Sequence, residues 1–173
     1  MTNPPATVWI NGELIPADRA TVSVYDRGFT SGDGVFETVK VVHGVPFAIT
    51  RHLRRLAESA HIIGFAPPPD AHLREAVAAT VDANLARLGD LGRLRVTLTA
   101  GRPQGSGSVP TRGGSDLTLV LTADPQTPHP GELKVVSVPW PHNERGPLVG
   151  AKTTSYADNL AVLEQVRQKG AEE

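Results

Sequence analysis

The sequence predicts an α+β protein in which a two-layer α/β domain is followed by the beginning of a second α/β domain. Three observations lead to this fold class. Asn11-Gly12 separates two short segments of strand-forming residues, residues 92–99 alternate between apolar and polar side chains, and residues 51–63 and 70–88 carry apolar side chains at helical spacing. A helix with one apolar stripe buries that stripe on a neighbouring element, so we expect these helices to pack on a sheet.

The first 49 residues are predicted to form mostly strands and turns. Asn11 and Gly12 accept positive φ, which suits the two-residue turn of a β-hairpin. The predicted segments, in order, are a hairpin of 8–10 and 13–15, a short strand around Val22 and Val24, a turn-rich loop at 25–34, and strands 35–42 and 45–49 joined at His43-Gly44.

Side chains alternate along the strand 35–42 and divide into two faces. Phe36, Thr38 and Lys40 share one face. The other face carries three valines and one acid, namely Val35, Glu37, Val39 and Val41.

Two helices follow this strand pair. Thr50 is predicted to cap the helix 51–63, which ends at Gly64, and Asp70 is predicted to cap a second helix that reaches Leu88. Arg55 lies on the side of the first helix opposite its apolar stripe. We therefore expect its guanidinium to face either water or a second structural layer.

Two arginines occupy one face of the predicted strand 92–99. Arg93 and Arg95 are two residues apart, a spacing that suits a carboxylate or a phosphate, because a guanidinium donates to such anions as a fork. A plain solvent-facing sheet surface explains the same spacing. The following segment, 101–114, reads as a loop that serves as a lid or a partner contact, and 116–122 reads as another strand.

A proline-rich stretch divides the chain. We expect an N-terminal domain of residues 1–124, a linker at 125–131, and the beginning of a second domain at 132–173. The second part contains a predicted strand at 133–139 and a final helix capped by Ser155. One strand and one helix do not close a core, so the second domain is expected to be incomplete.

Composition excludes several classes of protein. A net charge of −1 gives no field that attracts nucleic acid or an anionic membrane. The absence of cysteine excludes disulfides, thiolate catalysis and cysteine-ligated metals. No apolar run approaches the roughly 20 residues of a membrane span, and the polar start of the chain is unlike a signal peptide. The cytoplasm is the expected compartment, and no metal site is predicted.

Lys152 is the candidate for covalent chemistry. It carries the only charge between Leu148 and Ser155, lies at the end of an extended segment, and is followed four residues later by Tyr156. A desolvated lysine stays partly neutral, and a neutral amine adds to an aldehyde. A solvated surface lysine is the alternative interpretation.

Taken together, these segments resemble a known family. Five motifs in order carry the resemblance: Trp9-Ile10-Asn11-Gly12, Asp26-Arg27-Gly28-Phe29, Gly32-Asp33-Gly34-Val35-Phe36-Glu37, His52-Leu53-Arg54-Arg55-Leu56 and Ala151-Lys152-Thr153-Thr154-Ser155-Tyr156. The sequence is similar over its whole length to the fold-type IV, or class IV, pyridoxal-phosphate enzymes. These include branched-chain aminotransferases, D-amino acid aminotransferases and aminodeoxychorismate lyases. The resemblance implies that the second domain is barrel-like.

The resemblance also implies roles for individual residues. Lys152 matches the lysine that holds pyridoxal 5′-phosphate (PLP) as an internal aldimine and shuttles a proton. Arg55 matches the arginine that binds the cofactor phosphate, and Tyr156 resembles a tyrosine near the cofactor's phenolic oxygen. Phe36 and Lys40 fall at substrate-pocket positions, and Arg95 falls at the position of a group that binds the substrate carboxylate. A homodimer is implied as well, with residues 28–34 and 101–114 near the partner's site.

Departures from the family pattern leave the reaction open. An amino acid aminotransferase acting on an amino acid and a 2-keto acid is the main expectation, and an aminodeoxychorismate lyase of the 4-aminobenzoate pathway is the alternative. Thr99-Ala100-Gly101 replaces the Thr-Arg-Gly of D-amino acid enzymes, which disfavours D-specificity. Family members run about 100 residues longer, and that part holds a glutamate for the pyridine nitrogen. We therefore expect weak or no cofactor retention by this chain alone, and a non-catalytic dimerisation domain is the third hypothesis.

Overall fold

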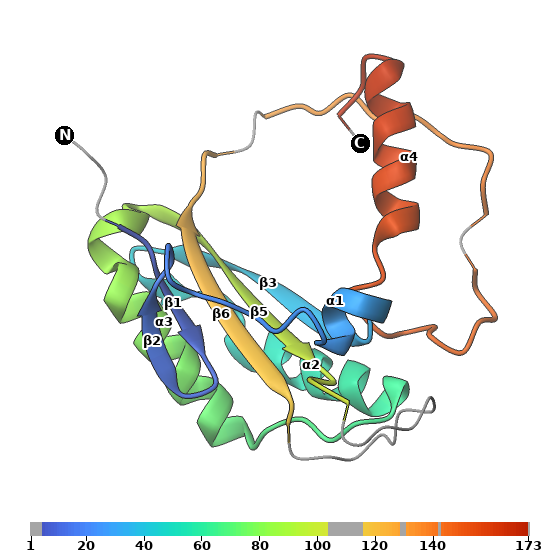
Figure 1. The fold of residues 1–173 in the computed structure, drawn as a ribbon. Helices are drawn as coiled ribbons and strands as arrows, with labels where there is room; N and C mark the ends of the chain where they lie inside the picture. Colours follow the sequence, from blue (N-terminus) through green and yellow to red (C-terminus); the bar gives the residue numbers. More distant parts are fainter. Residues whose placement is uncertain (1–4, 104–115, 129–130, 142, 173) are drawn as a thin grey trace.

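A computed structural model describes residues 5–103, 116–128, 131–141 and 143–172 of the chain (Figure 1). Within these residues, six strands form one sheet in the order β2-β1-β6-β5-β3-β4, and every neighbouring pair is antiparallel. The elements are β1 Thr7–Ile10, β2 Glu13–Pro16, α1 Arg27–Ser31, β3 Gly34–Val42, β4 Val45–Pro46, α2 Ile49–Ile63, α3 Asp70–Leu88, β5 Leu91–Thr99, β6 Thr118–Pro125 and α4 Ala157–Gln168.

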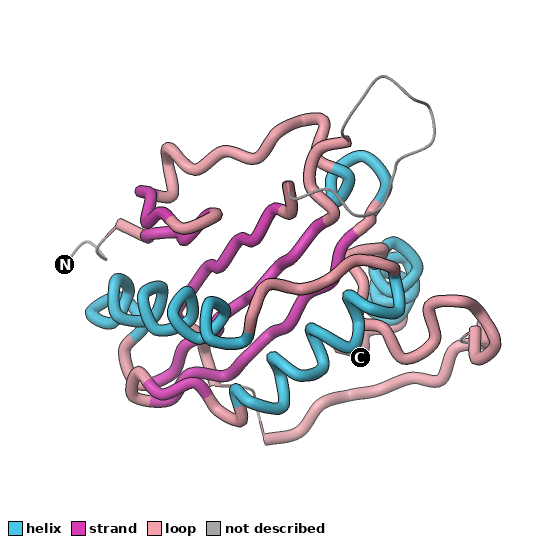
Figure 2. Tube along the Cα trace, turned by 90° about the horizontal axis from the view of Figure 1, so that it is seen from below, coloured by secondary structure: helices cyan, strands magenta, loops and turns pink. Residues whose placement is uncertain are grey.

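Helices α2 and α3 cover one face of the sheet, which makes two layers (Figure 2). Figure 1 shows residues 131–141 and 143–156 as a long arc of loop that returns beside α1, where α4 begins. Among the residues that the structure describes, no helix lies directly on the opposite face of the sheet. The predicted α+β, two-layer architecture is confirmed.

The core lies between the sheet and the two helices, and strand alternation produces it. Every second residue of β3 and β5 points to the helices, and the corresponding stripes of α2 and α3 meet them. Each fully buried aliphatic side chain contributes about 1.5–3 kcal/mol. Side chains with at most 2% exposure in this layer include Val35, Val39, Val41, Leu53, Leu56, Ala60, Leu73, Leu94, Val96 and Leu98.

Most predicted elements are confirmed with small shifts in their ends. The Asn11-Gly12 hairpin has positive φ at both turn residues, 47° and 105°. Both helices end at the predicted glycines, Gly64 and Gly89. The predicted strand 116–122 is β6, which starts at Thr118 and runs to Pro125. Most of the predicted loop 101–114 lies outside the described residues.

The segment between the two N-terminal hairpins was predicted wrongly. Val22 and Val24 are exposed and form no strand, and the predicted loop 25–34 contains the short helix α1. The Asp26 carboxylate begins this helix by accepting the Gly28 N–H at 2.7 Å. No described strand pairs with residues 22–24, and unpaired backbone does not hold a strand.

The predicted helix caps were also wrong, because each capping side chain has another partner. Thr50 accepts a hydrogen bond from Arg74 Nη2 at 3.2 Å, and α2 begins after Ala48, which has φ of 50°. Asp70 is the first residue of α3 and accepts from Arg74 Nε at 2.6 Å. Ser155 donates to the Gly32 carbonyl at 3.1 Å, two residues before α4.

Two predicted strands are missing or shortened. Residues 133–139 are irregular rather than a strand, and the predicted strand 45–49 is reduced to Val45–Pro46. Pro46 and the positive φ of Ala48 end the pairing with β3. The boundary at 125–131 stays a prediction. Within the described ranges, no helix has the length and apolar character needed to cross a bilayer.

Candidate active site

The backbone of Lys152 is attached to the free edge of β3. The Phe36 N–H donates to the Lys152 carbonyl at 3.0 Å, and the Thr154 N–H donates to the Gly34 carbonyl at 2.8 Å. Val35 and Thr153 form an antiparallel bridge between these two bonds. Residues 152–154 therefore extend the sheet beside the start of β3, and the pairing places the side chains of Lys152 and Phe36 on the same face.

Hydroxyl groups hold the same segment from two further sides. The Thr154 hydroxyl donates to the Gly32 carbonyl at 2.8 Å. Gly32 has φ of 66°, and a Cβ there would lie 2.5 Å from the Ser155 Oγ, so this turn requires glycine. The hydroxyl of Ser59, a fully buried residue of α2, accepts the Lys152 N–H at 3.0 Å.

Replacing Ser59 with alanine is expected to loosen the lysine segment. The Lys152 N–H would lose its acceptor, which costs about 1 kcal/mol of local stability. Amide hydrogen exchange at Lys152 should therefore accelerate by about fivefold. Ser31→Ala is the control, because the Ser31 hydroxyl donates to the Arg27 carbonyl within α1 and, among the described residues, forms no bond to the lysine segment. Equal exchange rates in the wild type and Ser59→Ala would contradict the assignment.

The amine of Lys152 lies against aromatic rings. Its Nζ is 4.2 Å from the centroid of the Phe36 ring and 5.3 Å from that of Tyr156, and the two rings meet edge to face with centroids 5.4 Å apart. The residue is half-buried. Within the described part of the chain, no carboxylate forms an ion pair with it. The half-buried position disfavours a fully solvated surface lysine, while the ring contacts fix the place of the amine.

Arg95 reaches the same ring from β5. Its Cζ is 3.8 Å from the centroid of Phe36, and its Nε donates to the Thr97 hydroxyl at 3.1 Å. Burial lowers the pKa of the Arg95 guanidinium, the charge of Arg93 lowers it further, and Tyr156 partly offsets both. The guanidinium and the Lys152 amine therefore share one aromatic platform, Phe36.

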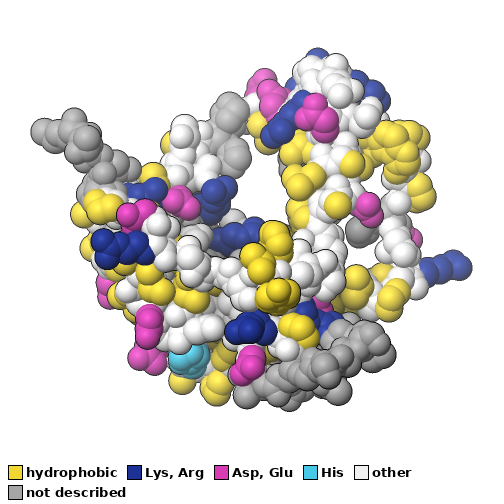
Figure 3. All heavy atoms as spheres, viewed as in Figure 1, with side chains coloured by type: hydrophobic (Ala, Val, Ile, Leu, Met, Phe, Trp, Pro, Cys, Tyr) yellow, Lys and Arg dark blue, Asp and Glu magenta, His cyan; other side chains and the backbone are white. Residues whose placement is uncertain are grey.

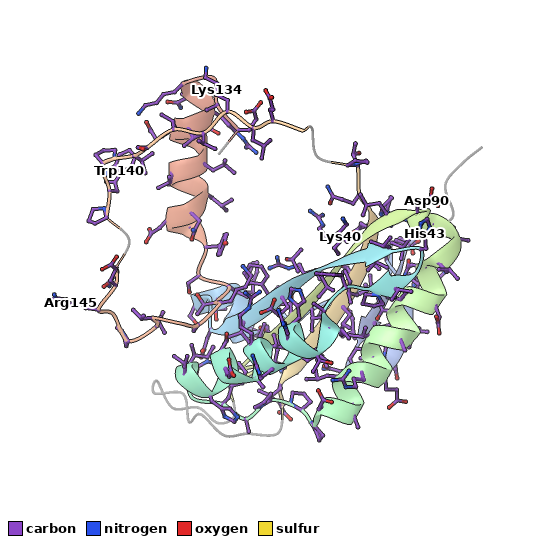
Figure 4. All side chains as sticks on the ribbon, turned by 180° about the vertical axis from the view of Figure 1, so that it is seen from behind. Lys40, His43, Asp90, Lys134, Trp140 and Arg145 are labelled. Carbon is purple, nitrogen blue, oxygen red and sulfur yellow. The ribbon has the colours of Figure 1, made fainter. Side chains whose placement is uncertain are left out.

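Lys40 lies farther along the same face. It is directly opposite Arg93 in the β3–β5 register, two pairs beyond Thr38 and Arg95. Figure 4 shows Lys40 extending from β3 away from α2 and α3, and Figure 3 shows lysine and arginine side chains over the middle of this face. Like charges in opposite positions repel each other, so the open face attracts anions.

Arg55 lies on the other face of β3. Its Nε donates to Glu37 Oε1 and its Nη2 to Glu37 Oε2, each at 2.6 Å, and His52 Nδ1 lies 2.7 Å from Oε2. Hydrogen bonds to Glu37 raise the pKa of the Arg55 guanidinium, and burial offsets this only in part. The Arg55 side chain is 50% exposed, whereas that of Glu37 is fully buried. From the sequence, the Arg55 guanidinium was expected to face water or a second structural layer. The contact with Glu37 of β3 was not predicted.

The predicted site residues thus form two groups. Lys152, Phe36, Tyr156 and Arg95 meet on one face, with Lys40 farther along it. Arg55 joins Glu37 on the other face. Because Phe36 and Glu37 are consecutive, both groups are attached to the same point on the edge of β3.

Sequence reasoning did not identify Glu37, His52 and Ser59 as parts of the site. For Glu37 a signal existed, since it is the single acid on a face of β3 otherwise made of valines. A carboxylate on a buried face requires partners.

The family model described as amino-transferase class IV matches residues 34–173, more than half of the chain. The chain belongs to the class IV aminotransferases. The resemblance seen in the five motifs is confirmed.

A curated relative within this family is the bifunctional aminodeoxychorismate lyase / D-amino acid transaminase of Mycobacterium tuberculosis. It is 31% identical over 175 residues, which are 95% of this chain and 57% of the relative. This class IV chain therefore spans less than two thirds of that protein's length.

Solved structures of class IV aminotransferases share the fold. A fold IV transaminase from Curtobacterium pusillum superposes with a TM-score of 0.82 at 30% identity, over 96% of this chain and 62% of that one. A hypothetical aminotransferase from Mycobacterium tuberculosis in a PLP-bound form gives a TM-score of 0.78 at 28% identity, over 96% and 60% of the two chains.

Proposed function

We propose that the chain functions in a PLP-dependent class IV aminotransferase that transfers an amino group from an amino acid to a 2-keto acid, with Lys152 as the cofactor lysine. The observation that carries this proposal is the placement of the Lys152 amine. Edge pairing with β3 and the buried Ser59 hydroxyl hold its backbone, and two aromatic rings surround its Nζ.

The residues present fit the cofactor. An aldehyde needs an amine that is partly desolvated, and Lys152 is half-buried against Phe36 and Tyr156. A phosphate needs a guanidinium with unused N–H groups. Arg55 donates the N–H of Nε and one N–H of Nη2 to Glu37, and its side chain is half-exposed. When bound, PLP supplies an aldehyde carbon and a ring that withdraws electrons from the substrate carbon.

Each cofactor-binding residue has a proposed task. Lys152 binds the cofactor through Nζ and afterwards accepts and returns the proton of the substrate Cα. Arg55 binds the phosphate through its outward N–H groups. Tyr156 keeps water from the amine with its ring and holds its hydroxyl for the cofactor's phenolic oxygen.

The substrate is proposed to bind on the open face beside Phe36. The Arg95 guanidinium and the Lys152 amine lie 3.8 Å and 4.2 Å from the same ring centroid, so they are no farther apart than the sum of these distances. Arg95 is proposed to bind the substrate carboxylate. Phe36, which is 5% exposed, lies beneath both cations, and Lys40 adds a positive charge along the strand.

Borohydride trapping tests the proposed function. The chain has four lysines, at positions 40, 134, 152 and 169. After incubation with PLP and reduction, peptide mapping should find the reduced label mainly on Lys152, at about tenfold or more over each other lysine. A uniform distribution over the four lysines would contradict the proposal. Weak total labelling that is confined to Lys152 would agree with the expected weak cofactor retention.

An aminodeoxychorismate lyase reaction is the second candidate function. The Mycobacterium tuberculosis relative, whose name includes this activity, supports it. Release of pyruvate without a keto acid acceptor would favour the lyase, whereas amino-acid-dependent amination of PLP would favour the aminotransferase. A non-catalytic dimerisation domain would show neither reaction. Ala100 stands where the D-amino acid enzymes have the arginine of Thr-Arg-Gly, and this difference predicts a low preference for D-amino acids. That preference stays a prediction.

A homodimer is part of this proposal. Val24, Tyr25 and Phe29 expose 66%, 66% and 76% of their surface around α1, and a protein partner would bury such neighbouring apolar side chains. The second copy is expected to cover residues 28–34. The cytoplasm stays the predicted compartment.

A further inference from the structure

We infer that Glu37 is a positioning residue that aims the Arg55 guanidinium at the cofactor phosphate, an inference that rests on the proposed function. Glu37 is fully buried on the helix-facing side of β3, among Val35, Val39 and Val41. Its role is to act on the cofactor through Arg55.

The contacts of Glu37 leave Arg55 little freedom. Both carboxylate oxygens accept from Arg55, each at 2.6 Å, and His52 Nδ1 is 2.7 Å from Oε2. A bidentate pair of this kind fixes the plane of the guanidinium as well as its place. His52 and Arg55 are three residues apart on α2, so one helical turn supplies both partners of the carboxylate.

The same contacts leave donors available for an anion. Of the five N–H groups of a guanidinium, Glu37 uses the one on Nε and one on Nη2. Among the described residues no acceptor is recorded for Nη1. The arginine side chain is half-exposed, so its remaining donors are accessible to a ligand. An arginine without Glu37 would sample many rotamers and would lose entropy on binding a phosphate.

Glu37 also ties the phosphate end of the site to the lysine end. Ser59, which accepts the Lys152 N–H, follows Arg55 by one helical turn on α2. Phe36, which donates to the Lys152 carbonyl, precedes Glu37 on β3. The pair α2–β3 therefore sets the separation of the guanidinium and the amine, and the Glu37–Arg55 contact joins the two elements at that point.

A purely structural ion pair makes a different prediction from a positioning residue. If Glu37 only stabilised the fold, its removal would weaken the binding of every aldehyde at Lys152 alike. If Glu37 aims Arg55, its removal would weaken the binding of PLP, while pyridoxal, which lacks the phosphate, would be little affected. The ratio of the PLP and pyridoxal concentrations needed for half-maximal binding separates these roles.

The experiment measures that ratio on the full chain. Each protein is titrated with PLP or with pyridoxal, and the label on Lys152 is trapped with borohydride. The concentration that gives half-maximal label is determined for the wild type, Glu37→Gln and Glu58→Gln. Glu58 is an exposed acid on the same helix that pairs with Arg54, and it serves as the matched control. We expect the wild type and Glu58→Gln to prefer PLP equally, and Glu37→Gln to lower the preference about tenfold.

A milder variant covers the case in which Glu37→Gln does not fold, as judged by circular dichroism. His52→Gln removes one partner of the carboxylate and leaves the Arg55 fork in place, so the preference should fall by about threefold. A preference within about twofold of the wild type in the folded variants would overturn the inference, as would a wild type without preference for PLP. A chain in which neither aldehyde labels Lys152 would instead contradict the proposed function.

Discussion

Replacing Lys152 with alanine should slow the amino-acid-dependent amination of PLP by at least about a hundredfold. The variant loses the amine that binds the aldehyde and the base that takes the substrate proton, while the aromatic platform of Phe36 and Tyr156 remains. The measurement follows the loss of aldehyde absorbance after addition of an amino acid, at a PLP concentration that saturates the wild type.

Lys169→Ala is the control for this prediction. Lys169 is exposed just after α4, and its removal should change the rate by less than about twofold. Circular dichroism would show whether both variants keep the fold. A folded Lys152→Ala variant with a rate within tenfold of the wild type would show that another group carries the proton, and the assigned role would be wrong.

The second large effect is expected at Asp26, where Asp26→Ala should lower the free energy of unfolding by about 3 kcal/mol. The Asp26 carboxylate is 1% exposed. Its Oδ1 accepts the Gly28 N–H at 2.7 Å, and its Oδ2 accepts the hydroxyls of Thr99 and Thr118 at 3.0 Å and 2.6 Å. Alanine would leave three donors at the ends of β5, β6 and α1 without this acceptor.

Urea unfolding of the purified variants measures this effect. Asp18→Ala is the matched control, because Asp18 is exposed in the turn after β2, and it should change stability by at most about 0.5 kcal/mol. A loss of less than about 1 kcal/mol for Asp26→Ala would mean that water replaces the carboxylate and that α1 is not held by it.

The elements that sequence predicted well are those in which local pattern and tertiary packing agree. Alternation in 35–42 and 92–99 matches a sheet with one covered face, and the stripes of 51–63 and 70–88 match helices that cover it. Asn11-Gly12 encodes its turn through positive φ at both residues. In each case a short stretch contains the whole signal.

The errors occurred where a polar side chain had two possible partners. Thr50 and Ser155 satisfy local rules for capping, yet Arg74 and the Gly32 carbonyl take their hydroxyls. Residues 133–139 have the composition of a strand, but they pair with no strand among the described residues. Partners from distant parts of the chain decided these cases, and local sequence does not reveal them.

The candidate site divides in the same way. Lys152, Arg55, Tyr156 and Phe36 were predicted because they belong to short ordered motifs, and Arg95 was predicted from the alternation of the strand 92–99 and the family resemblance. The acid that holds Arg55 and the hydroxyl that holds Lys152 were missed, because Glu37 and Ser59 lie beside their partners only in the folded chain. Glu37 is the last residue of the third motif and the single acid among the valines on its face of the strand, but neither signal identifies its partner.

By itself, the sequence determined the two-layer α+β class and the family, and it predicted Lys152 as the reactive amine, because periodicity and short motifs are local properties of the chain. Only the tertiary structure decided that residues 152–154 extend the edge of β3, with the amine on the Phe36 face and the Arg55 guanidinium on the Glu37 face. The physical reason is that edge pairing joins backbone groups more than 100 residues apart, and hydrogen bonds of that kind depend on which edge of the sheet is left unpaired.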